Sequence, residues 1–188
     1  MHLSPLCVSL RGSGKEVKRM SDDFGRPKDE VTAAELAAFH VAVWRETYRD
    51  LAPAEAYAQL DEARRLPQWQ AALSDPAHQI RVLREEGGII GLAHTAPGAG
   101  EIMTGFGEIR HLYLRPDRQG QGLGRKLLQE ALAGLRAAGH RRAALAVVAG
   151  NAKARAFYRH CGGREDLAFT DPGPLWRSDN LRVVWDLT

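Results

Sequence analysis

The stretch Arg118-Gln119-Gly120-Gln121-Gly122-Leu123-Gly124 decides how this chain is interpreted. It follows a strand-like run over residues 109–114 and precedes a helix-like run over residues 125–138. The first amides of a helix have no partner within the helix, and the helix dipole adds partial positive charge there. Because glycine lets a backbone approach a ligand closely, this turn predicts a cradle for a diphosphate.

Two common nucleotide-binding loops do not fit the spacing. The P-loop needs Lys-Ser/Thr directly after its last glycine, whereas Gly124 is followed by Arg125, Lys126 and Leu127. The dinucleotide-binding fingerprint needs an acidic residue in the next strand, and residues 143–149 contain no carboxylate. The loop therefore argues against ATP, GTP and NAD as ligands.

A third pattern, Gln/Arg-x-x-Gly-x-Gly/Ala, fits through Gln119, Gly122 and Gly124. The strand-like run before it ends in Pro116, and a second group of residues follows at Asn151, Ala154, Phe157, Tyr158, Gly162 and Gly163. In these features residues 108–164 resemble the GNAT superfamily of acetyl-CoA-dependent N-acetyltransferases. The resemblance is weaker in the N-terminal half of the chain.

The expected order of elements gives a mixed α/β (α+β) sheet. Helical periodicity covers residues 32–49, with a capping box at Thr32 and Glu35, and then residues 53–60 and 66–73. The remaining elements are a strand hairpin at 79–84 and 89–95, a loop at 97–107, a strand at 108–114, a helix at 125–138, a strand at 143–149, a helix at 152–160 and strands near 164–170 and 181–187. The resemblance implies the same fold, a central, mostly antiparallel sheet flanked by helices.

Length and composition predict one domain. Of the 188 residues, we expect 26–188 to form a single GNAT-like domain and 1–25 to be a weakly ordered extension, with Met20 as a candidate start of the folded protein. The segment 23–28 is a poor strand where the family usually has one. No signal peptide and no membrane-spanning run is expected. The distant Cys7 and Cys161, and histidines without ligand spacing, indicate a cytoplasmic protein without a metal.

The formal net charge of +3 is distributed unevenly. Basic residues dominate between 110 and 164, where Asp117 and Glu130 are the acidic ones. This asymmetry suits an anionic ligand such as coenzyme A, and it also suits a nucleic acid. Since no helix-turn-helix, RNP-like or zinc-finger pattern accompanies it, we expect no nucleic acid as partner.

The resemblance implies that acetyl-CoA is the co-substrate and that the loop and the strand before it hold it. The residues concerned are Leu112, Tyr113, Leu114, Gln119, Gly120, Gln121, Gly122, Leu123, Gly124, Arg125, Asn151 and Tyr158. Backbone amides of the strand would polarise the thioester carbonyl. Asn151 also fits a plain helix N-cap, and Leu112 and Leu114 also fit a plain core.

Acyl transfer to an amine needs an acid and a base. The resemblance makes Tyr158 the acid that protonates the leaving thiolate, although a buried aromatic residue would look the same in sequence. Glu108 is our candidate base, with a solvated strand end as the alternative. Glu101, His94 and His111 compete with it.

Two further features carry weaker signals. Cys161 fits a small core residue better than a nucleophile, because no partner base is identifiable. On the first helix, His40, Trp44 and Tyr48 share one face, which usually means core. The resemblance adds that Trp44 and Tyr48 line the acceptor site.

Together these features predict an N-acetyltransferase that moves an acetyl group from acetyl-CoA to a primary amine by direct attack. The acceptor is a small molecule or a peptide, and a homodimer fits the resemblance. The competing hypothesis is an acyl-CoA-binding sensor without turnover.

Overall fold

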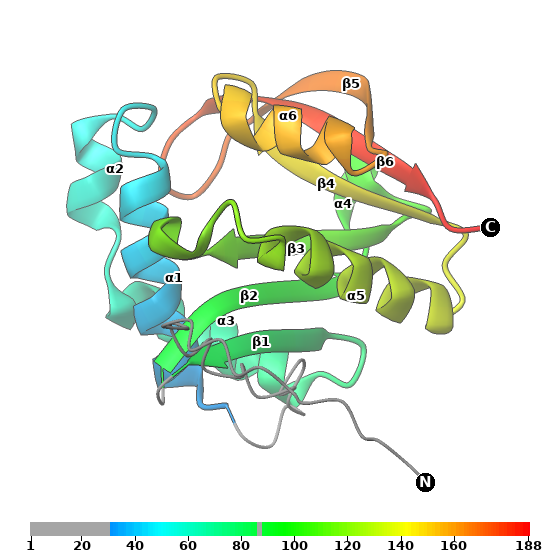
Figure 1. Cartoon of the computed structure of the whole chain (residues 1–188). Helices are drawn as coiled ribbons and strands as arrows, with labels where there is room; N and C mark the ends of the chain where they lie inside the picture. The colour runs from blue at the N-terminus through cyan, green and yellow to red at the C-terminus, as the bar shows by residue number, and fades with distance from the viewer. Residues whose placement is uncertain (1–30, 86–87) are drawn as a thin grey trace, which may run out of the picture.

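The computed structural model describes residues 31–85 and 88–188 (Figure 1). The predictions for residues 1–25, for Met20 and for a strand at 23–28 lie outside the described residues. The helices are α1 (Ala33–Thr47), α2 (Ala54–Gln59), α3 (Glu62–Ser74), α4 (Gly100–Met103), α5 (Leu123–Ala137) and α6 (Ala152–His160). The strands are β1 (Gln79–Glu85), β2 (Gly88–Pro97), β3 (Gly107–Leu114), β4 (Arg142–Val148), β5 (Arg164–Asp171) and β6 (Ser178–Asp186).

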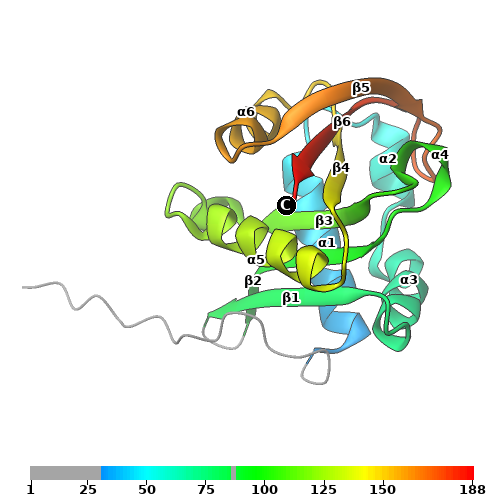
Figure 2. The ribbon, with the colours of Figure 1, turned by 90° about the vertical axis from the view of Figure 1, so that its right-hand side faces the viewer.

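The strands form one sheet in the order β1-β2-β3-β4-β6-β5. Every neighbouring pair is antiparallel except β3 and β4, which run parallel. Figure 2 shows α5 and α6 on one face of this sheet and α2, α3 and α4 on the other. The predicted mixed sheet between helices is confirmed.

The parallel pair β3–β4 is paired only at its beginning. Gly107 pairs with Ala143 and Glu108 with Ala144, and no further pair follows within the described residues. Beyond Glu108 the two strands splay apart, so the sheet contains a notch between them. The rest of β3 keeps its partner β2 on the other edge.

A β-bulge in β3 changes which face its side chains meet. Thr95 of β2 pairs with Ile109, whereas His94 pairs with His111, so Arg110 is the extra residue. Ile109 belongs to the core under α5, while His111 contacts α1 and α3 on the opposite face. Simple alternation would have placed Ile109 and His111 on the same face.

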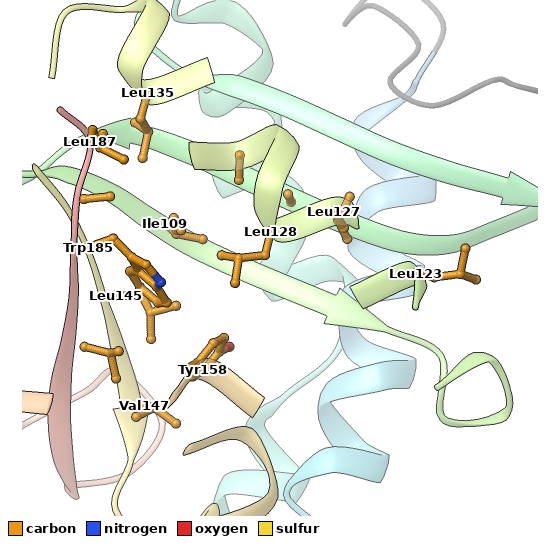
Figure 3. Close-up of a cluster of buried hydrophobic side chains, with 14 of the residues drawn as sticks. Ile109, Leu123, Leu127, Leu128, Leu135, Leu145, Val147, Tyr158, Trp185 and Leu187 are labelled. Carbon is orange, nitrogen blue, oxygen red and sulfur yellow. The ribbon is translucent and has the colours of Figure 1, made fainter. Parts of the chain in front are cut away.

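The α5–α6 face covers the larger core. Leu127, Leu128 and Leu135 of α5 pack against Leu145 of β4 and other strand residues (Figure 3). These leucines form one apolar stripe of the helix. The helix begins at Leu123, two residues before the predicted start, with Gly122 as its N-cap.

Two sequence-based boundaries were wrong on the other face. The third helix begins at Glu62 rather than Leu66, because the Asp61 side chain caps it by accepting a 2.7 Å hydrogen bond from the Arg64 amide. Pro67 lies within this helix, near its first turn. The predicted loop 97–107 contains the short helix α4.

The capping box of α1 gives a stability prediction. Thr32 Oγ1 accepts from the Glu35 amide at 3.2 Å, and Glu35 Oε2 accepts from the Thr32 amide at 2.9 Å. We expect Thr32→Ala to lower the free energy of unfolding by about 1 kcal/mol, because an amide of the first turn loses its acceptor. Urea denaturation measures this change, and Thr104→Ala, at the end of the short helix α4, is a comparison outside the cap.

Candidate active site

The N-terminus of α5 is open to an anion. Gly122 and Gly120 have φ of 80° and 76°, and a Cβ built at either position would meet nothing within 4 Å. No side chain caps this helix and its first turn carries no acidic residue, in contrast to α1, α3 and α6, which side chains cap. The first-turn amides thus face open space, and a diphosphate group fits the donors there.

The residues before this turn anchor it to the sheet. Arg118 Nε donates to Glu85 Oε2 at 2.6 Å, and Arg118 also pairs with Asp117. Gln119 Nε2 donates to the Leu114 carbonyl at 3.3 Å, while Gln119 Oε1 is buried without a hydrogen-bond partner. Arg118 therefore holds the loop to β1, and Gln119 keeps one acceptor unused at the end of β3.

The edge of β3 that faces the notch offers backbone groups. The Arg115 amide donates to the Ile90 carbonyl of β2 at 2.9 Å. Because backbone groups alternate between the two edges of a strand, Leu114 and Leu112 turn theirs away from β2, toward the notch. Tyr113 turns its backbone toward β2 and its side chain toward α1. The side chains of Leu112 and Leu114 pack against the α5 core, which leaves their notch-facing backbone groups available for a ligand.

The other edge of the notch is β4, which leads directly into α6. The Asn151 side chain caps this helix by accepting from the Ala154 amide at 3.1 Å. Tyr158 is 8% exposed and lies edge-on to Trp185 (Figure 3). Burial raises the pKa of Tyr158 well above that of a free phenol, and the neighbouring Tyr48 adds to the rise. Its hydroxyl is therefore protonated at neutral pH.

Tyr48 links this edge of the notch to the first helix. It ends α1, and it raises the pKa of Tyr113 as well as that of Tyr158, so the three hydroxyls lie in one region. Trp44 is buried beside it, with ring centroids 5.1 Å apart, and Trp176 from the turn before β6 contacts both rings. Of the two residues predicted to line the acceptor site, Tyr48 is half-buried, and the buried Trp44 packs against it.

A pocket of about 610 Å³ opens beside the carboxyl end of β4. It lies between the α1–α2 turn, the β4–α6 turn and the start of β6, and its lining includes Asp50, Leu51, Gly150, Trp176 and Asp179. Charged groups of both signs line this pocket, since Arg177 lies in it beside the two carboxylates.

Glu108 is the last residue of β3 that pairs with β4. Burial raises the pKa of its carboxyl above 4.5, while Arg110, whose Nε lies 3.4 Å from Oε2, and the Ala99 amide act in the opposite direction. A raised pKa brings a carboxylate closer to the range of a useful base. The competing Glu101 lies exposed on α4.

The other competitors, His94 and His111, lie together. Their rings are stacked with centroids 5.3 Å apart, and His40 meets His111 edge-on at 4.7 Å. His78, which sequence reasoning did not select, completes the group through a contact of 2.9 Å with His94. Because these histidines are far apart in the sequence, no local pattern could predict that they lie together.

Cys161 ends α6 as a free, half-buried thiol, and burial raises its pKa. The thiolate population is thus reduced, which agrees with a packing role. In the described ranges, no three or more His, Cys, Asp or Glu residues are grouped as a metal site. Nor does any helix of residues 31–85 and 88–188 have the length and apolar character needed to cross a membrane.

Comparisons with known proteins agree with this geometry. Residues 42–162 match the sequence profile of the acetyltransferase (GNAT) family, while a search of curated proteins gives no significant match. Solved structures with the same fold include a ribosomal-protein-alanine N-acetyltransferase from Brucella melitensis, at 25% identity and a TM-score of 0.64 over 86% of this chain and 98% of that one.

Two others were solved with a coenzyme. YncA from Salmonella typhimurium, with acetyl-CoA, is 21% identical with a TM-score of 0.63 over 84% of this chain and 91% of that one. PaiA N-acetyltransferase from Thermoplasma acidophilum, with coenzyme A, is 17% identical with a TM-score of 0.63 over 86% of this chain and 96% of that one. With the family profile covering more than half of its length, the chain belongs to the GNAT family of acetyltransferases and is an acyltransferase.

Proposed function

We propose that this protein transfers an acetyl group from acetyl-CoA to a primary amine, and that residues 26–188 act as one catalytic domain. The observation that carries the proposal is the uncapped N-terminus of α5 beside the β3–β4 notch. The helix N-terminus supplies hydrogen-bond donors for a diphosphate, and the notch supplies an opening in the sheet for the reacting groups. The free thiol of Cys161 is compatible with the expected cytoplasmic location.

Acetyl-CoA supplies an activated acyl group, and the residues of this chain would bind it, orient it and transfer protons. The amides of Leu123, Gly124 and Arg125, with the turn Gly120–Gly122, would hold the diphosphate. The notch-facing backbone groups of Leu112 and Leu114 would hold the pantetheine arm and polarise the thioester carbonyl, and Asn151 would add a hydrogen bond from the other side of the notch. A single well-aimed donor is worth roughly 3 kcal/mol in such a transition state.

Two side chains would transfer protons during the reaction. Glu108 would take a proton from the bound ammonium, since its raised pKa suits a base. Tyr158 would donate its hydroxyl proton to the leaving sulfur. A sensor without turnover would need neither group, so their placement at the notch favours the enzyme.

The acceptor would enter from the face of the sheet opposite α5 and α6. Tyr48, supported by Trp44, would form its wall. The pocket lined by Asp50, Asp179 and Arg177 would take the part of the acceptor beyond the reacting amine, whether the acceptor is a small molecule or a peptide.

A thiol-release assay with acetyl-CoA and a panel of amines and peptides tests this function. We expect turnover with at least one primary amine and little hydrolysis of acetyl-CoA when no amine is present. Stoichiometric acetyl-CoA binding without transfer to any amine would instead support the sensor. The absence of acetyl-CoA binding would contradict both.

Replacing Glu108 with glutamine gives a pH-dependent prediction. A base works only when deprotonated, so wild-type kcat/KM should fall as the pH drops through the raised pKa of this carboxyl. Glu108→Gln should lower kcat by about 100-fold and remove that acidic limb. Glu101→Gln, on exposed α4, should leave the profile unchanged. An unchanged acidic limb in Glu108→Gln would assign it to another group.

A further inference from the structure

Three histidines form a row that begins on the splayed part of β3 and ends near the protein surface. His111 Nδ1 lies 3.1 Å from His94 Nδ1, and His94 Nε2 lies 2.9 Å from His78 Nδ1. His78 Nε2 in turn lies 3.6 Å from Oδ2 of Asp75. His94 is 4% exposed, whereas half the Asp75 side chain is accessible to solvent. The row therefore crosses buried protein and ends at solvent.

The contacts restrict where the protons sit. A neutral imidazole has one N–H and one lone pair, so only two proton patterns satisfy both ring–ring contacts. The Asp75 carboxylate favours a proton on His78 Nε2, which makes His78 Nδ1 the acceptor for His94 Nε2–H. His94 Nδ1 then accepts from His111 Nδ1–H. In this pattern His111 Nε2 keeps its lone pair, and every ring donates toward the surface.

The surroundings of His111 keep its ring neutral. The titratable and charged groups that face it are His40 from α1, Arg65 from α3, His94 from β2, and Arg110 and Tyr113 on its own strand. Burial lowers its pKa well below 6.5, and His40, His94, Arg65 and Arg110 lower it further. A proton that reaches this ring is thus driven onward rather than held.

The reaction produces a proton that needs such a path. An ammonium nitrogen carries three hydrogens, and the nitrogen of the secondary amide product carries one. Of the two protons lost, one is returned to the sulfur as the thiol forms. The other must leave the site. Glu108 is half-buried and paired with Arg110, so a path through other groups would assist the release of this proton.

We propose that His111, His94 and His78 form a proton relay that carries this second proton from the notch to solvent beside Asp75. The inference rests on the proposed acetyltransferase function. His111 Nε2 gains a proton, and the Nδ1 proton of His111 passes to His94 Nδ1. The Nε2 proton of His94 passes to His78 Nδ1, and the Nε2 proton of His78 leaves. Each ring gains one proton and loses one, so charge and atoms balance.

The position of each ring fits this role. His111 follows the bulge at Arg110, which turns it to the same face of the sheet as Glu108, three residues earlier. It lies on the part of β3 beyond the last pair with β4. His40 contacts His111 edge-on but forms no hydrogen bond through its buried Nδ1, so it lies beside the relay and not within it.

The central test is His94→Phe, which keeps a ring in the stack and removes both linking nitrogens. With an amine that the wild type acetylates, we expect kcat to fall by about 10- to 100-fold at unchanged acetyl-CoA affinity. The remaining rate should rise with buffer concentration, because a diffusing base must replace the relay, while the wild-type rate should not. His40→Phe changes a buried ring of the same cluster and should show neither effect.

A second measurement does not depend on turnover. Two-bond proton–nitrogen NMR spectra report histidine tautomers, and we expect N–H on Nδ1 of His111 and on Nε2 of His94 and His78. The reversed pattern would overturn the relay whatever the enzyme does. An active wild type with a fully active or buffer-independent His94→Phe would also overturn it and leave the acetyltransferase intact. A wild type that acetylates no amine, despite the expected tautomers, would refute the function and the relay with it.

Discussion

Replacing Tyr158 with phenylalanine is expected to lower kcat by about 100-fold or more while acetyl-CoA binding is retained. The change removes only the hydroxyl that would protonate the leaving sulfur. The ring would keep its edge-on contact with Trp185, at 5.9 Å, and its place in the core of α5 and α6, so the fold should persist. Steady-state kinetics with a calorimetric measurement of affinity separate the two effects.

Tyr57→Phe is the matched control for this experiment. It removes a phenol hydroxyl from half-buried Tyr57 of α2, which donates to the Arg45 carbonyl at 2.8 Å. We expect kcat close to that of the wild type. Equal losses in both variants would point to general destabilisation, and full activity of Tyr158→Phe would assign protonation of the sulfur to another donor or to water.

Gly122→Trp is expected to weaken acetyl-CoA binding by about 100-fold or more. Gly122 is the N-cap of α5, and its missing Cβ points into open space where we place the diphosphate. An indole at this position would cover the first-turn amides. The loss corresponds to about two hydrogen bonds to a charged group, at roughly 1.5 kcal/mol each. Isothermal titration calorimetry measures it directly.

The other end of the same helix supplies a control in which a glycine of similar backbone conformation is replaced. Gly139, just beyond the C-terminal end of α5, has φ of 90° and also nothing within 4 Å of a built Cβ. Gly139→Trp therefore imposes the same left-handed strain without approaching the cradle. We expect it to bind acetyl-CoA like the wild type. If both variants bind normally, the diphosphate does not lie at this turn.

Local sequence patterns were sufficient to predict the helices and strands and part of the candidate site. The glycine turn before α5, the Thr32 capping box and the Asn151 cap could be identified from sequence, since short-range sterics and hydrogen bonds between residues three or four apart determine them. Errors were concentrated at boundaries. The start of α3 depends on a cap at Asp61, and the proline within the helix obscured it.

Alternation correctly places His111 on the face opposite Leu112, but its relation to Ile109 could not be predicted. Alternation from Ile109 gives the wrong side, because one extra residue, Arg110, is inserted opposite β2. Such a bulge depends on the pairing partner, which is fifteen or so residues away in the chain and carries no local signal. The relay residue His78 was overlooked for a related reason, since its partner His94 belongs to a different strand.

The sequence by itself determined the glycine turn, the helices and strands, and the family resemblance, because each depends on neighbouring residues and their periodicity. The tertiary structure alone decided the notch after Glu108, the meeting of Tyr48, Tyr113 and Tyr158, and the row of histidines. These arise where separate elements cross, and their geometry follows from the packing of two helical layers on one splayed sheet.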